Sequence, residues 1–380
     1  MAPRRSKNSK SPPILSHEFF IQNHADIVSC IAMVFIIGLM FQATSPIAGL
    51  FITLQHNQTV NDSITGDTSM VYGTGVRDLF TVCFYSLVCI VVHAVIQEYL
   101  LDKLNRKMHL SKVKHSKFNE SGQLLVFFLV SAVWGADLFF RENYITSVNQ
   151  LWEGYPHNHL PFIVKFFFIV QIAYWLHNYP ELYFQKVRKE EISDRVQYTT
   201  MYLSLIAAAY FLNFNRVALC LLVLHYTTEF LYHTALLCHY SEKTDLASSI
   251  FMVFDVLFVL VRLGSITLAV LTFWIGLAQS SQNSIDIATG NYNSNFMRMT
   301  CLAAVCLSQA GLMWNFITFQ LRKFREKSAS GSSSRKPRSP TKKKQPVVKP
   351  IAAEDLDALP EVDQNAASEN GSVRARRTKK

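Results

Sequence analysis

The residues with the clearest chemical potential are three ionisable side chains inside one apolar run, residues 217–238. His225, Glu229 and His233 recur at every fourth position, so an α-helix would project them from nearly one face. Two such residues can share a metal ion or act as an acid–base pair, but the third lies about 12 Å from the first along the helix axis. One helix therefore does not bring all three to a single metal ion.

Two more ionisable residues, Asp255 and Arg262, lie seven positions apart in the next apolar run. They share a helix face, and either can satisfy Glu229 by pairing. Three interpretations stay open: a structural hydrogen-bond network, the lining of a polar cavity, and catalysis. We expect His225, Glu229, Asp255 and Arg262, with His233, to line an intramembrane polar groove. We predict no catalytic, cofactor-binding or metal-ligating residue.

Other ionisable residues inside apolar runs are Asp137, Lys165, His177 and Arg298. Lys165 is near the beginning of its run, so we expect its ammonium group to snorkel to the membrane interface. Arg298 begins its run and needs no partner within the membrane.

Eight apolar runs, each close to the ~20 residues that cross a bilayer as a helix, must position these side chains. In lipid a segment has to pair its own backbone groups, which favours helices, and the runs do not alternate as barrel strands would. We therefore predict an all-α integral membrane protein with eight transmembrane helices. The predicted spans are 27–47, 79–99, 122–140, 160–181, 198–213, 217–238, 250–277 and 297–320.

Basic residues alternate between the segments that join these spans. Of the 37 Lys and Arg residues, 31 lie in the two tails and the second, fourth and sixth loops, 3 lie in the other four loops, and 3 lie inside spans. Because basic segments stay cytosolic, both termini are predicted to be cytosolic. The short, polar span 198–213 is the one on which this parity depends.

Two glycosylation sequons fall in the first loop that the charges place in the lumen. Asn57 begins Asn-Gln-Thr, and Asn61 begins Asn-Asp-Ser; we predict glycosylation at Asn57, with Asn61 as a second candidate. The first span is interpreted as an uncleaved signal anchor because its hydrophilic lead of 26 residues is long for a signal peptide. All seven cysteines lie in apolar runs, so no disulfide framework is predicted.

The chain divides by composition into four regions. These are a basic cytosolic tail (1–26), the first two spans with their loops (27–115), a six-helix membrane domain (116–325) and a cytosolic tail (326–380). The last region is rich in Ser, Lys and Pro and then becomes acidic and again basic, so we expect disorder. Such basic segments attract anionic lipids or ribosomal RNA, and a solvated tail that only enforces topology remains the alternative.

Several long motifs resemble the translocating chain-associated membrane protein family of the endoplasmic reticulum. They are LSHEF at 15–19, NHADI at 23–27, HAVIQEY at 93–99, KHSKFNESGQ at 114–123, YWLH at 174–177 and PELYFQ at 180–185. The resemblance covers about residues 10–327. It implies an eight-helix glycoprotein beside the Sec translocon that helps signal sequences and transmembrane segments of nascent chains to enter lipid.

The same resemblance implies a TLC-type domain, shared with ceramide synthases, over 116–325. At the positions of that family's paired histidines this chain has Tyr198 and Thr199, its His-Asp corresponds to His225-Tyr226, and its later acid corresponds to Glu229, so one His and one acid are retained. Acyl transfer needs acid–base groups within reach of the amine, so we expect no enzyme, but a bundle that accommodates lipid. The alternatives are a sphingolipid N-acyltransferase, a lipid-binding or lipid-sensing protein, and a transporter, against which the absence of a visible internal repeat counts.

Overall fold

A computed structural model describes residue 13 and residues 16–61, 68–144, 146–280 and 284–333 of the chain. The chain divides into two compact units, residues 1–306 and 307–380. Every candidate site residue lies in the first unit.

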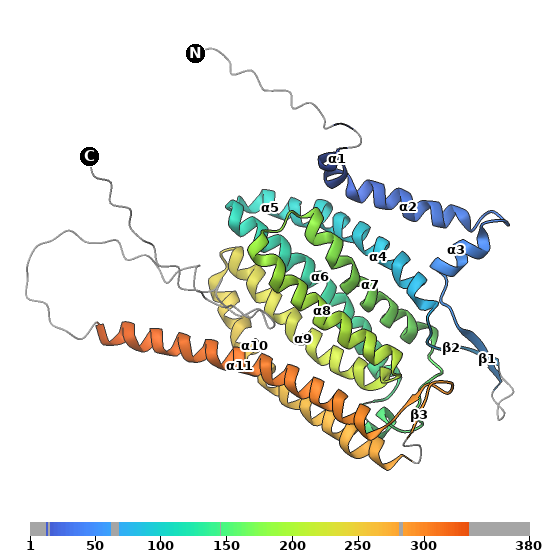
Figure 1. Ribbon diagram of the computed structural model, residues 1–380. Coiled ribbons are helices and arrows are strands. Elements are labelled where there is room, and N and C mark those ends of the chain that lie inside the picture. The colour runs from blue at the N-terminus through green and yellow to red at the C-terminus, as the bar shows by residue number, and fades with distance from the viewer. Residues whose placement is uncertain (1–12, 14–15, 62–67, 145, 281–283, 334–380) are drawn as a thin grey trace, which may run out of the picture. The chain divides into compact units, whose positions relative to one another are not determined.

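Helices make up most of the described residues (Figure 1). The longer ones are α2 (His24–Gly38), α4 (Asp78–Val95), α6 (Lys112–Arg141), α7 (Phe162–Phe184), α8 (Lys189–Phe211), α9 (Asn215–Tyr240), α10 (Thr244–Ala269) and α11 (Asn295–Ser333). The shorter ones are α1 (His17–Gln22), α3 (Ser45–Ile52), η1 (Ile96–Leu101), α5 (Asp102–Met108), η2 (Val148–Leu151), η3 (Val270–Gly276) and η4 (Leu277–Gln279).

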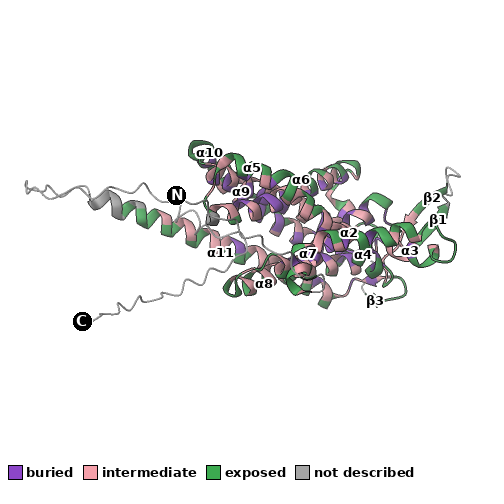
Figure 2. Ribbon diagram, turned by 90° about the horizontal axis from the view of Figure 1, so that it is seen from above, coloured by how far each residue is buried: buried purple, intermediate pink, exposed green. Residues whose placement is uncertain are grey.

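Six long helices, α4 and α6 to α10, lie side by side in the first unit (Figure 1). α9 packs against α6, α8 and α10, while α7 packs against α4, α6 and α8. Figure 2 shows that buried residues gather between these helices and that exposed ones cover the outward faces of α2 and α3. The core is aromatic, and Trp175, Tyr210 and Tyr226 are its largest fully buried apolar side chains.

Helices occupy all eight segments that the sequence predicts as spans. Within the described part of the chain, four helical stretches are both long and apolar enough to cross a membrane: 78–108, 114–141, 244–279 and 295–326. The helices α7, α8 and α9 have 23, 23 and 26 residues, about 34–39 Å at 1.5 Å per residue. These helices are long enough to cross a membrane but more polar than the four stretches above. Much of the surface of α7 and α9 is buried against other helices, where polar side chains can find partners.

The prediction of one continuous first span over 27–47 is wrong. α2 ends at Gly38 and, after a turn, α3 begins at Ser45 with Pro46 in its first turn, where proline is compatible with a helix start. α3 folds back along α2, as the contact between the Phe35 and Phe51 rings shows, with ring centroids 4.7 Å apart. α2 alone, with 15 residues, is about 22 Å long.

Two short hairpins depart from a purely helical fold, and both lie in loops predicted to be lumenal. β1 (Asn57–Asn61) pairs antiparallel with β2 (Thr68–Tyr72), and β3 (Ile285–Asp286) pairs with β4 (Asn291–Tyr292). At the other end of the chain, α11 continues to Ser333, eight residues into the region predicted to be a disordered tail, because extending an existing helix costs less than starting one, even through Ser and Gly. The rest of that tail, 334–380, lies outside the described residues.

The four loops predicted to be lumenal meet at one side chain, Asn213, in the turn between α8 and α9. Its amide nitrogen donates to Asn158 Oδ1 and to the Gly290 carbonyl, each at 2.9 Å. Its amide oxygen accepts from the Thr74 hydroxyl at 3.2 Å. Asn213 has a φ of 60°, a left-handed conformation that asparagine tolerates better than most residues. We call this contact the Asn213 junction.

Candidate functional site

The polar residues that the sequence places on α9 and α10 meet in a contact between His225 and Arg262. Arg262 Nη2 donates to His225 Nδ1 at 2.8 Å, and a guanidinium has no lone pair to offer in return. His225 Nδ1 is therefore unprotonated, and the ring proton sits on Nε2, which is hydrogen-bonded to the Tyr202 hydroxyl of α8. This arrangement fixes a neutral imidazole and joins three helices.

Two further residues complete what we call the α9–α10 polar cluster. The Thr228 hydroxyl accepts from Arg262 Nη2 at 2.9 Å and donates to the His225 carbonyl at 2.6 Å. Glu229 Oε1 lies 3.7 Å from His225 Nδ1, and the guanidinium of Arg262 lies over the Phe258 ring at 4.8 Å. Arg262 is fully buried and Glu229 is 2% exposed, so the charges are kept inside the bundle, where interactions between charges are strong.

The structure does not bring all five predicted groove residues into this cluster. His233 lies two turns further along α9, where its ring stacks on Phe128 with a centroid separation of 5.6 Å. Asp255 is half-buried on α10, two turns before Arg262. His225, Glu229 and Arg262 thus form one site, whereas His233 belongs to a separate aromatic contact.

Tyr198, Thr199 and Tyr226 stand at three of the positions that the resemblance to ceramide synthases aligns with acid–base residues. Tyr198 makes an edge contact with Trp175, and Trp175 stacks on Tyr202 at 4.1 Å. The Tyr226 hydroxyl donates to Gln171 at 2.9 Å, and Thr199 is buried on α8. The space around His225 is therefore filled by packed rings. Among the described residues, no three His, Cys, Asp or Glu side chains are placed to hold a metal ion.

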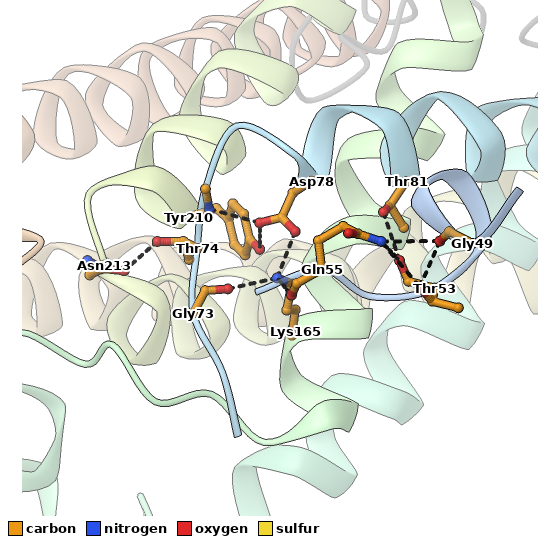
Figure 3. Close-up of polar contacts among 11 residues, drawn as sticks. Gly49, Thr53, Gln55, Gly73, Thr74, Asp78, Thr81, Lys165, Tyr210 and Asn213 are labelled. Carbon is orange, nitrogen blue, oxygen red and sulfur yellow. Dashed lines mark hydrogen bonds and ion pairs between the residues drawn. The ribbon is translucent and has the colours of Figure 1, made fainter. Parts of the chain in front are cut away.

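A second buried charged centre, absent from the predicted site, joins Lys165 of α7 to Asp78 at the start of α4. Figure 3 shows the ammonium group between the carboxylate and two backbone carbonyls. Lys165 Nζ lies 2.7 Å from Asp78 Oδ1 and donates to the carbonyls of Gln55 and Gly73 at 2.8 and 2.7 Å. The Tyr210 hydroxyl donates to Asp78 Oδ2 at 2.8 Å.

This centre corrects the expectation that Lys165 snorkels. The Lys165 side chain is fully buried. Its ammonium group finds its partners inside the protein, in Asp78 and in the carbonyls at both ends of the β1–β2 segment, and so does not need to reach the membrane interface. The sequence contained a signal for it, namely a lone lysine in an apolar run, which requires an acid nearby. Asp78 was overlooked because it lies one residue before the predicted span.

His56 lies beside this centre, in the segment that leads into β1. Burial lowers the pKa of its imidazole, an effect that Asp78 opposes and Lys165 reinforces. Gly75 packs against the ring so closely that a Cβ there would lie 2.4 Å from His56 Nε2. The sequon residue Asn57 follows directly and is exposed on β1.

All seven cysteines are free thiols, in agreement with the predicted absence of a disulfide framework. Asp137, which was predicted to lie inside a span, is near the end of α6 with half of its side chain exposed and pairs with Arg141 at 2.8 Å.

Comparison with known proteins gives two kinds of similarity. Residues 117–318 match the TLC domain family model. Over 321 residues the chain is 50% identical to translocating chain-associated membrane protein 2 of Homo sapiens, which covers 84% of this chain and 85% of that protein. The corresponding mouse (Mus musculus) protein is 48% identical over 341 residues, 88% of this chain and 91% of that protein.

A more distant relative is an enzyme by name. The ceramide synthase FUM18 of Gibberella moniliformis is 24% identical over 231 residues, which is 60% of this chain and 52% of that protein. At 24% identity, this similarity by itself assigns no chemistry to His225.

Proposed function

Since the chain belongs to the translocating chain-associated membrane protein family, we propose that it is an accessory component of the Sec translocon in the endoplasmic reticulum membrane. There it helps signal sequences and transmembrane segments of nascent chains to pass into lipid. The observation that carries this proposal is the 50% identity over 84% of the chain. The translocon channel and nascent chains are its partners, with the ribosome as a further partner of the basic tail.

We also propose eight spans with both termini in the cytosol. The Asn213 junction supports this topology, because Asn213, at the end of the predicted span 198–213, contacts Thr74, Asn158 and Gly290 from the other three predicted lumenal loops. Segments that meet in this way lie on the same side of a membrane, so each pair of helices between them must cross and return. Glycosylation at the exposed Asn57 tests whether this side of the membrane is the lumen. Asn57→Gln should remove a glycosidase-sensitive shift in electrophoretic mobility, and Asn61→Gln is the matched control.

The predicted groove requires a movement of the bundle. His225, Glu229 and Arg262 are buried and contact one another, so a client segment reaches them only where α9 and α10 separate. A marginally hydrophobic segment would find polar partners there that hydrocarbon lacks, which lowers the cost of leaving the channel. In the structure the cluster is a buried hydrogen-bond network that joins α8, α9 and α10.

Translocation assays with matched secretory precursors test this function. Microsomes depleted of the protein should import precursors with weak signal sequences several-fold less well, while strong signals are unaffected, and adding back the purified protein should restore import. Equal dependence of weak and strong signals would refute the proposal. Adding back Arg262→Met, shown to be folded by its unfolding transition, tests the groove; Asp137→Asn, on the exposed end of α6, is the control.

We infer that the chain is not an N-acyltransferase, although the distant similarity to a ceramide synthase makes that the second candidate. Tyrosine or threonine stands at three of the acid–base positions, and Trp175 and Tyr202 stack beside the retained His225. Incubating the purified protein with sphingoid base and acyl-CoA should give no ceramide. Ceramide formation that His225→Ala abolishes would overturn this inference.

A further inference from the structure

A third group of polar side chains, of which His177 and Glu181 are buried, His93 is half-buried and Gln185 is exposed, lies at the opposite end of α4 and α7 from the Asn213 junction. It comprises His93 on α4 and His177, Glu181 and Gln185 on or just after α7. His93 Nε2 is 3.4 Å from Glu181 Oε1, and the rings of His93 and His177 are 5.7 Å apart. We call this group the α4–α7 acceptor cluster. Its members come from the motifs that carry the family resemblance, and the proposed function uses none of them.

The hydrogen bonds determine where the protons of this cluster are. His177 Nδ1 contacts the Tyr174 carbonyl, which only accepts, so Nδ1 carries the proton and Nε2 has a free lone pair. Gln185 Nε2 is 3.1 Å from both Glu181 Oε1 and His93 Nε2. If the Gln185 amide were turned over, its oxygen would face the Glu181 carboxylate, which also only accepts. The Gln185 NH₂ group therefore donates to Glu181 Oε1 and to His93 Nε2, and His93 Nε2 is an acceptor.

The cluster therefore holds more acceptors than donors in a buried place. His177 is 1% exposed and Glu181 is 6% exposed, and His177 Nε2 and Glu181 Oε2 are buried without a hydrogen-bond partner. Buried acceptors, and above all a buried carboxylate, are costly unless a donor or a cation complements them. A positively charged group with several N–H donors would complement these acceptors.

The spacing of the acceptors favours an ammonium group over a metal ion. Zinc ligands lie about 2.0–2.2 Å from the ion, and among the described residues no three His, Cys, Asp or Glu side chains are placed for that. A primary ammonium has three donors and hydrogen-bonds at about 2.7–2.9 Å to each acceptor. We propose that the α4–α7 acceptor cluster binds the primary ammonium group of a membrane lipid headgroup, as in an ethanolamine phospholipid.

The surroundings of the cluster favour lipid as the source of the ammonium. Val92 and Val95 are 48% and 49% exposed, and Tyr99 on η1 is 61% exposed, so the helix that carries His93 also presents apolar surface that lipid chains would cover. Along α7, Glu181 is 16 residues from Lys165, about 24 Å. With Lys165 near one interface, that distance places Glu181 close to the other headgroup layer of a ~30 Å hydrocarbon core.

Lipid binding by the full-length protein in nanodiscs or detergent tests the proposal. Native mass spectrometry should show phosphatidylethanolamine retained about tenfold more than phosphatidylcholine, whose quaternary ammonium has no N–H, or phosphatidylglycerol, which has no ammonium. Glu181→Gln should abolish this preference, and His177→Phe should weaken it. Glu98→Gln, which changes an exposed carboxylate on η1, should leave it unchanged, and the unfolding transition verifies that each variant is folded.

Competition distinguishes the possible sources of the ammonium group. Soluble phosphoethanolamine should displace the lipid at high concentration if the headgroup is what the cluster recognises. Displacement only by a lysine-flanked signal peptide would overturn the lipid proposal in favour of a polypeptide ligand. Equal retention of phosphatidylethanolamine and phosphatidylcholine by the wild type, or an unchanged preference in Glu181→Gln, would also overturn it.

Discussion

Replacing Lys165 with methionine should be among the most destabilising substitutions in the chain. Methionine fills a similar volume, but it leaves the carboxylate of Asp78, which is 1% exposed, without the cation that now lies at 2.7 Å. Breaking a buried ion pair from one side costs about 3–5 kcal/mol. The carbonyls of Gln55 and Gly73 also lose their charged donor, so the upper part of that range is expected.

The assay is thermal unfolding of the purified protein in detergent. A loss of about 4–5 kcal/mol corresponds to a fall in Tm of roughly 8–20 °C, taking about 2–4 °C per kcal/mol for a domain of a few hundred residues. The double variant with Asp78→Asn should recover part of the loss, because it removes the unpaired charge, and a double-mutant cycle measures the coupling.

The exposed pair of Asp137 and Arg141 provides the control. Its side chains are 48% and 70% exposed, so Arg141→Gln should change stability by no more than about 1 kcal/mol. The reasoning fails if Lys165→Met is as mild as Arg141→Gln, or if the double variant is less stable by the full sum of the two single effects.

Three further predictions concern the loops around the Asn213 junction. Burial, with Arg216 nearby, lowers the pKa of His157 to about 4. Below pH 6.5 the unfolded chain therefore takes up a proton that the folded chain does not, and the free energy of unfolding should fall by about 2 kcal/mol from pH 7.5 to 5. A series of Tm values against pH should show this fall for the wild type and a smaller one for His157→Gln. Asn213→Ala loses three hydrogen bonds and strains a residue at φ 60°, so it should cost about 2–4 kcal/mol; Asn213→Gly keeps the backbone freedom and should be milder by about 1 kcal/mol in denaturant unfolding. Gly276→Ala puts a methyl group 2.1 Å from the Trp152 ring, and a change in tryptophan fluorescence with reduced stability should report the displaced indole.

Much of the fold could be predicted because lipid leaves few choices for a long apolar run. Helices occupy every predicted span, and the basic residues indicate an arrangement of loops that the Asn213 junction supports. The break between α2 and α3 was missed because the apolar run continues through it, and hydropathy carries no information on chain direction. Pro46 was the local signal, since proline is tolerated in the first turn of a new helix and disrupts the middle of a continuing one.

The candidate sites were predicted less completely, because a charge inside the membrane indicates a partner without identifying it. Spacing on one helix correctly grouped His225 with Glu229, and Arg262 was expected nearby on the next helix. It also grouped His233, which packs on Phe128 instead, since a shared face does not imply a shared neighbour two turns away. Tyr202 was not expected at all: as a neutral residue on a third helix, it gave no charge signal.

The Asn213 junction also determines the order in which the chain can mature during synthesis. Thr74 is made 139 residues before Asn213, and Gly290 is made 77 residues after it. At about 5–20 residues per second, the first of these loops waits roughly 10–40 s for the last. During that time the loops already synthesised carry polar groups whose native partners have not yet left the ribosome. The newly made chain therefore passes through the translocon before its own lumenal contacts can form.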